Sequence, residues 1–239
     1  MASGLNFFAT RIDKTPAAGT FIDVDVSGDG VPAGATGALL WIDNTTADSI
    51  SFELRKNGST NSFGLAIQNG TCGIFAMVGL DANLIFEATT ATGVKVWLIG
   101  YTDDAATLLT NVTAITPGTT GSWQDIDLSA IVPVDTTGVV VRCRGGVDNA
   151  SIVSVRRNDG TETWPQCTSG QGALRAHYQI AQVDANRLIE GYADAAGRII
   201  ELVGYFASPI TFIAPVDLST ATTGSWVDVD VSADVDATA

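Results

Sequence analysis

Hydrophobic and polar residues alternate with a period of two along much of this chain. In residues 21–26 the aromatic and acidic side chains fall on one face of an extended segment, and the aliphatic side chains fall on the other. Residues 123–128 repeat the alternation with one tryptophan and two aspartates on the polar side. One face of each segment therefore suits a core and the other suits solvent. The pattern predicts two half-buried β-strands.

The other apolar segments are short and are separated by turn-forming residues. Clusters such as SGDGVPAG at 27–34 and NGSTNS at 57–62 supply Gly, Pro, Asn and Ser between them. The further strands expected in the first copy are 7–12, 37–43, 50–56, 72–78, 84–89 and 94–101. No stretch shows convincing helical periodicity. About eight short strands in about 100 residues predict an all-β fold of tandem jelly-roll/immunoglobulin-like antiparallel β-sandwich domains of about 102 residues.

An internal repeat sets the domain organisation. The string GTFIDVDVS begins at residue 19 and recurs as GSWQDIDLS from 121 and GSWVDVDVS from 224, which are steps of 102 and 103 residues. Four further blocks keep the same order and a nearly constant offset in the first two copies. We therefore predict domains at 1–105 and 106–208, followed by a partial third repeat at 209–239. The short linkers predict domains stacked end to end.

The partial third repeat supplies only about two strands, and two strands with an apolar face are not stable alone. Two explanations stay open. The segment completes the sheet of another subunit by strand addition or swapping, or the sequence belongs to a longer protein with more copies.

Charge and composition narrow the function. The chain carries 12 Lys+Arg against 26 Asp+Glu, a net charge of −14, which disfavours nucleic acid and anionic membrane surfaces as partners. The apolar stretch at 57–80 contains too many polar residues for membrane insertion. No signal peptide is evident, so we expect cytoplasmic synthesis. The single histidine, His177, and the absence of known catalytic motifs predict a protein that is not an enzyme and needs no cofactor.

The repeated polar strand face holds the candidate ligand-binding residues. Paired carboxylates two residues apart can bind one Ca²⁺ ion, or they can form a solvated face that opposes aggregation. Trp123 and Trp226 share that face, and an aromatic ring beside carboxylates can bind a sugar or pack against a neighbouring segment. The weak calcium candidates are Asp23, Asp25, Asp125, Asp127, Asp228 and Asp230.

Cysteine and arginine suggest two further features of the second copy. Cys143 and Cys167 could form a disulfide, although free buried thiols are the default for cytoplasmic synthesis. Four arginines concentrate positive charge on an otherwise acidic chain, either as a contact for an acidic neighbour or as strand-face ion pairs. They are Arg142, Arg144, Arg156 and Arg157.

The string T-x-G-S-W-x-D-[IV]-D-[LV]-S, followed by V-P-x-x-x-T-G and a basic-Asn turn, resembles a β-sandwich repeat of structural proteins in tailed bacteriophages. Such repeats occur in head fibres, capsid decorations and tail appendages. The resemblance implies a non-enzymatic virion structural protein, exposed on the particle surface, that forms a homo-oligomer and contacts other virion proteins. The alternative is a glycan-binding module for host attachment, or a surface adhesin, that uses Trp123 and Trp226.

Overall fold

The computed structural model describes residues 4–61, 65–67, 73–145, 152–161, 176–207, 210, 212, 218 and 227–233. These residues form fifteen β-strands and no helix, so the prediction of an all-β fold is confirmed. The first half of the chain contains β1 (Leu5–Asp13), β2 (Ile22–Asp25), β3 (Gly37–Asn44), β4 (Ile50–Lys56), β5 (Leu65–Ile67), β6 (Gly73–Gly79), β7 (Ile85–Thr90) and β8 (Val94–Thr102). The second half contains β9 (Ala106–Ala114), β10 (Gln124–Asp127), β11 (Gly138–Arg144), β12 (Val153–Arg157), β13 (Ala176–Gln182), β14 (Leu188–Ala193) and β15 (Ile199–Phe206). Among the described residues there is no helix long and apolar enough to span a membrane.

The first half is a sandwich of two four-stranded antiparallel sheets. Sheet A has the order β1-β8-β3-β6, and sheet B has the order β2-β7-β4-β5. Successive strands therefore alternate between the two sheets, except that β4 and β5 are neighbours in sheet B, and the first strand pairs with the last. This is the strand order of a jelly roll rather than of an immunoglobulin domain.

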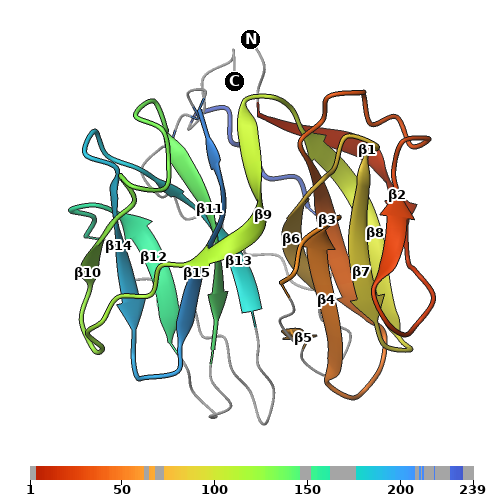
Figure 1. Ribbon diagram of the computed structural model, residues 1–239, viewed down its shortest axis with the longest axis horizontal. Helices are drawn as coiled ribbons and strands as arrows, with labels where there is room; N and C mark the ends of the chain where they lie inside the picture. The colour runs from red at the N-terminus through yellow and green to blue at the C-terminus, as the bar shows by residue number, and fades with distance from the viewer. Residues whose placement is uncertain are drawn as a thin grey trace.

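The second half has the same strand order in its described part. Sheet C runs β9-β15-β11-β13 and sheet D runs β10-β14-β12, which matches the order of the first half except that no strand corresponding to β5 occurs among the described residues. Figure 1 shows the two sandwiches, with the first half in red to yellow and the second half in green to blue. The domain boundaries at 105 and 208 stay predictions. They lie close to the end of β8 and the end of β15.

Each sandwich has its own core between its two sheets. In the first core the alternating residues Ala38, Leu40 and Ile42 of β3 face sheet B and are buried with Phe52 and Phe86. In the second core Val139, Val141 and Cys143 of β11 occupy the corresponding positions. Because side chains alternate across a strand, the intervening residues of β3 and β11 lie on the outer faces of sheets A and C.

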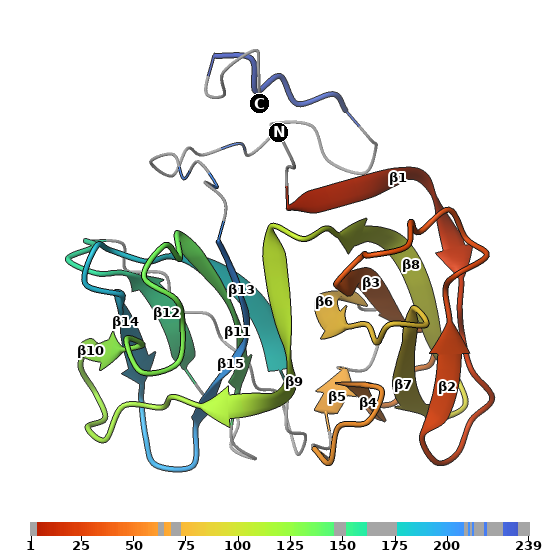
Figure 2. The same ribbon diagram turned by 45° about the horizontal axis from the view of Figure 1, so that its top comes forward.

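A third apolar cluster joins the two halves. Its buried members come from sheet A of the first half and from sheet C of the second half, and they are Leu39, Met77, Ala106, Leu108, Val140, Val203 and Phe206. Figures 1 and 2 both show the sandwiches side by side, with β9 between them. The expectation of end-to-end stacking was wrong. Apolar residues on the outer sheet faces make lateral packing the arrangement that removes more apolar surface from water.

The turn before β7 and the turn before β14 are built in the same way. Asp81 Oδ1 accepts hydrogen bonds from the backbone N–H groups of Asn83 and Ile85, at 2.9 and 2.8 Å. Leu84, between them, has a φ of 62°, in the left-handed region. Its counterpart Arg187 has a φ of 63°. The aspartate bonds hold a backbone conformation that side-chain sterics alone disfavour.

Little of the partial third repeat lies in the described part of the chain. Residues 227–231 form no strand, although the sequence predicted one there. Val229 and Val231 are 47% and 37% exposed, whereas their counterparts Val24 and Val26 are buried under sheet A. A strand needs a ladder partner and a core to cover its apolar face, and the described residues supply neither at this segment.

Candidate functional site

The predicted acidic strand faces are present on sheets B and D. Asp23 of β2 lies directly opposite Glu87 of β7, and Asp125 of β10 lies directly opposite Glu190 of β14. Within the described ranges no group of three His, Cys, Asp or Glu side chains could hold a metal ion.

The second carboxylate of each Asp pair has a local structural role. Asp25 Oδ1 accepts a hydrogen bond from the Ser27 backbone N–H at 2.8 Å, and Asp127 makes the same bond to Ser129 at 2.8 Å. These bonds lower the pKa of Asp25 and of Asp127. Asp230 bonds Ser232 in the same way at 2.9 Å, while Asp228 is exposed nearby. Asp25 and Asp127 therefore each close a turn at the end of a strand, and Asp230 makes the same bond in a segment that forms no strand.

Arginine side chains link the acidic rows to the aromatic residues. Arg156 Nε donates to Glu190 Oε2 at 2.6 Å, and its guanidinium carbon lies 4.2 Å from the centre of the Trp123 ring. The Tyr192 ring lies 5.6 Å from that of Trp123. One face of Trp123 is therefore covered by the protein itself. Trp226, the other predicted sugar-binding residue, lies outside the described residues.

The four predicted interface arginines do not form one patch. Arg142 and Arg144 lie on the outer face of sheet C and converge on Glu201, with Nε to Oε2 distances of 2.8 and 3.0 Å. Arg142 and Glu201 are both 2% exposed. Arg156 lies on sheet D, and Arg157 follows it at the exposed end of β12. The first two arginines thus belong to a buried ion cluster, and Arg156 to a strand-face pair.

Cys143 and His177 are neighbours across the ladder of β11 and β13. Cys143 carries a free, buried thiol, and burial raises its pKa. Its predicted disulfide partner, Cys167, lies outside the described residues. Burial lowers the pKa of His177 to about 4, so its side chain is neutral at pH 7. Neither side chain is in the ionised form that a nucleophile or an acid catalyst would use at that pH.

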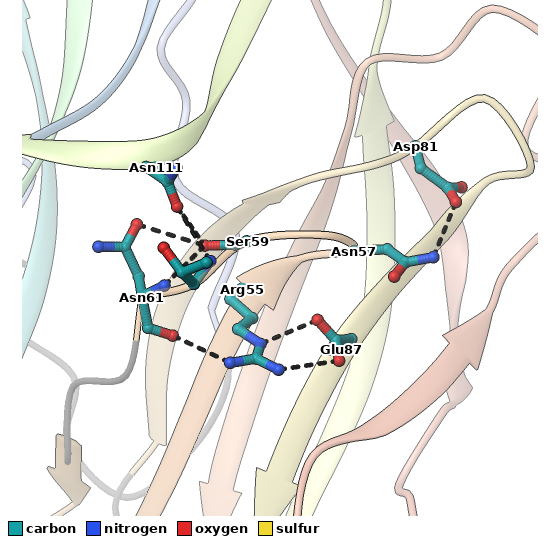
Figure 3. Close-up of polar contacts among 8 residues, drawn as sticks. Arg55, Asn57, Ser59, Asn61, Asp81, Glu87 and Asn111 are labelled. Carbon is teal, nitrogen blue, oxygen red and sulfur yellow. Dashed lines mark hydrogen bonds and ion pairs between the residues drawn. The ribbon is translucent and has the colours of Figure 1, made fainter.

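A polar cluster between the halves was not identified from the sequence. Asn111 Oδ1 on β9 accepts hydrogen bonds from Ser59 Oγ at 2.9 Å and from the Thr60 backbone N–H at 3.1 Å. In return, Asn61 Oδ1 accepts a hydrogen bond from the Val112 backbone N–H at 3.0 Å. Figure 3 shows Asn111 facing Ser59 and Asn61 of the turn that follows β4. We call these five residues the latch.

Ion pairs and side-chain bonds connect the latch to sheet B. Arg55 Nη1 donates to the Asn61 backbone oxygen at 3.3 Å, while Nε and Nη2 hold both oxygens of Glu87 at 2.8 and 3.0 Å (Figure 3). Asn57 Nδ2 donates to Asp81 Oδ2 at 2.9 Å. Bonds within the first sandwich therefore fix the position of the turn after β4, and this turn also contacts β9 of the second half. The only signal in the sequence was the turn string NGSTNS at 57–62, whose composition is common in any turn.

No protein-family model matches the chain, and no curated protein matches it.

The chemistry of the latch itself indicates its role. Its polar side chains are two amides and two hydroxyls, which hold a contact and do not titrate near pH 7.

Proposed function

We propose that this protein is a non-enzymatic structural component of a tailed-bacteriophage particle. It would be exposed on the virion surface as a capsid decoration, head fibre or tail appendage, would assemble as a homo-oligomer and would contact other virion proteins. The sequence resemblance of the repeated W-x-D-x-D string suggested this class.

One observation carries the proposal: two jelly-roll halves of the same strand order are fixed side by side. Jelly rolls are common building units of viral capsids. An apolar cluster and the latch both cross the contact between the halves. The acidic rows that contain Asp23 and Asp125 favour solubility at the high local concentration of a particle surface.

Electron microscopy with immunogold labelling tests the proposal. An antibody against the purified protein should label phage particles at defined surface positions, and the purified protein should have the native mass of an oligomer by light scattering. A monomer that is absent from every particle would overturn the proposal. The label position would also distinguish a head location from a tail location.

A further inference from the structure

Two tryptophans lie next to each other on the outer face of sheet A. Trp41 of β3 is the direct ladder partner of Trp97 of β8. The alternate residues Leu40 and Ile42 fill the first core, so Trp41 lies on the opposite face of the sheet. Both tryptophans are partly exposed.

Both indole N–H groups bind one carboxylate. Trp97 Nε1 donates to Asp43 Oδ2 at 2.8 Å, and Trp41 Nε1 donates to Asp43 Oδ1. The polar edges of the two rings are therefore satisfied within the protein. Either ring can therefore offer a ligand only a flat face that no other group of the protein covers.

Neighbouring strands complete a flat strip across sheet A. On the β1 side the Arg11 guanidinium carbon lies 3.9 Å from the Trp97 ring centre, and the Arg11 side chain is 52% exposed. On the β6 side a Cβ at Gly73 would clash with three atoms of the Trp41 indole, so the ring face lies over that glycine. Arg11, Trp97, Trp41 and Gly73 thus form one row over the four strands of the sheet.

The second half shows that the fold does not require this aromatic pair. Arg142 and Glu201 are the ladder partners at the positions that correspond to Trp41 and Trp97. The ion pair is 2% exposed at both residues, whereas the tryptophans are partly exposed. Burial energetics alone would favour the reverse, with the charges in water and the aromatic rings covered. Partly exposed aromatic side chains at positions that tolerate charge indicate a binding surface.

The charge around the strip selects the ligand class. Arg11 lies 3.5 Å from Asp43, and Lys95 lies 3.3 Å from Asp13 at the edge of the strip. These four charges cancel on a chain whose net charge is −14. A cationic ligand would meet Arg11, which already occupies the Trp97 face. A neutral sugar ring has an apolar C–H face for the Trp41 ring and hydroxyl groups for the exposed polar side chains around it.

We propose that Trp41, Trp97 and Arg11 form a binding site for neutral pyranose glycans on the outer face of sheet A. This site is separate from Trp123 and Trp226, and it goes beyond the structural role proposed above. Trp41 would stack on a sugar ring, while Arg11 would donate hydrogen bonds to its hydroxyls. Asp43 would fix the orientation of both indoles.

A printed array of neutral and acidic glycans, followed by calorimetric titration of the strongest neutral hit, tests the site. We expect the wild type to bind neutral glycans. Trp41→Ala and Arg11→Ala should each weaken binding by roughly tenfold or more. Trp123→Ala is the matched control and should bind like the wild type. Melting curves would check that each variant is folded, and Arg11→Ala has an exposed side chain whose removal spares the core.

Three results would overturn this assignment. They are no binding of the wild type to any neutral glycan, loss of binding in Trp123→Ala but not in the folded site variants, and binding restricted to acidic glycans. Because the assay uses the isolated protein, its failure leaves the virion proposal to be judged by particle labelling alone.

Discussion

Asn61 and Asn111 exchange hydrogen bonds between the two halves of the molecule. Each side-chain oxygen accepts from the backbone next to the other residue, at 3.0 Å from Val112 and 3.1 Å from Thr60. The bonds join the turn after β4 to β9, about 50 residues away in the chain. Thr60 and Asn111 are exposed, so water competes for the first of these bonds, whereas the bond from Val112 to Asn61 is partly buried.

We predict that Asn111→Ala destabilises the protein by about 0.5–1.5 kcal/mol, because two hydrogen bonds at a partly exposed contact lose their acceptor. Urea unfolding followed by circular dichroism measures this change. Asn57→Ala is the control, since its bond to Asp81 lies within the first half. The double variant Asn61→Ala/Asn111→Ala should lose less than the sum of the single changes, because the two residues share one contact. Strict additivity would contradict a coupled latch.

Glu201→Gln should cost about 3–5 kcal/mol of unfolding free energy. The change leaves the charges of Arg142 and Arg144 buried without a carboxylate. Glu190→Gln removes a similar pair with Arg156 whose side chains are 14–15% exposed, and it should cost about 1.5 kcal/mol. Chemical denaturation of both variants gives the comparison. Equal losses would show that burial does not set the strength of these ion pairs.

Leu108→Ala and Phe7→Ala form a matched pair on equivalent edge strands. Leu108 pairs with Gly204 and is 4% exposed between the halves, whereas Phe7 pairs with Gly100 and is 63% exposed. The first change should cost about 2–5 kcal/mol through cavity formation, and the second less than about 0.5 kcal/mol. Thermal unfolding measures both. A large effect at Phe7 alone would mean that the apolar contact between the halves contributes little.

The neutral state of His177 should make stability depend on pH between 6.5 and 4. Burial lowers the pKa of His177 in the folded protein from 6.5 to about 4. As the pH falls, His177 therefore binds its proton first in the unfolded chain. The contribution of neutral His177 to the unfolding free energy is complete above pH 6.5. It declines by about 1.4 kcal/mol per pH unit down to pH 4, about 3 kcal/mol in all. His177→Gln should remove this slope in urea titrations at several pH values, and an unchanged slope would assign it to other groups.

Local sequence was sufficient for most of the strands. The expected segments 37–43, 50–56 and 94–101 differ from β3, β4 and β8 by at most one residue at either end. Alternation is a local signal, and it identifies a strand that has one buried face. The three-residue β5 was missed, because so short a segment carries too few alternations to stand out from a loop.

The contacts between distant residues could not be predicted in this way. Trp41 and Trp97, like Asn61 and Asn111, are neighbours only after the sheets have formed and the halves have packed. The four arginines illustrate the same limit. Their spacing suggested one patch, but Arg142 and Arg156 lie on different sheets of the second sandwich.

The sequence by itself determined the features that depend on neighbouring residues. The strand alternation, the turns and the repeated bond from Asp25 to Ser27 all act over a few positions, so their chemistry is readable in the printed chain. Only the tertiary structure decided which outer faces meet, why Arg142 is buried and why Trp41 is partly exposed. Those outcomes depend on which pairs of surfaces remove the most apolar area from water, and that quantity belongs to the folded sheets rather than to any one segment.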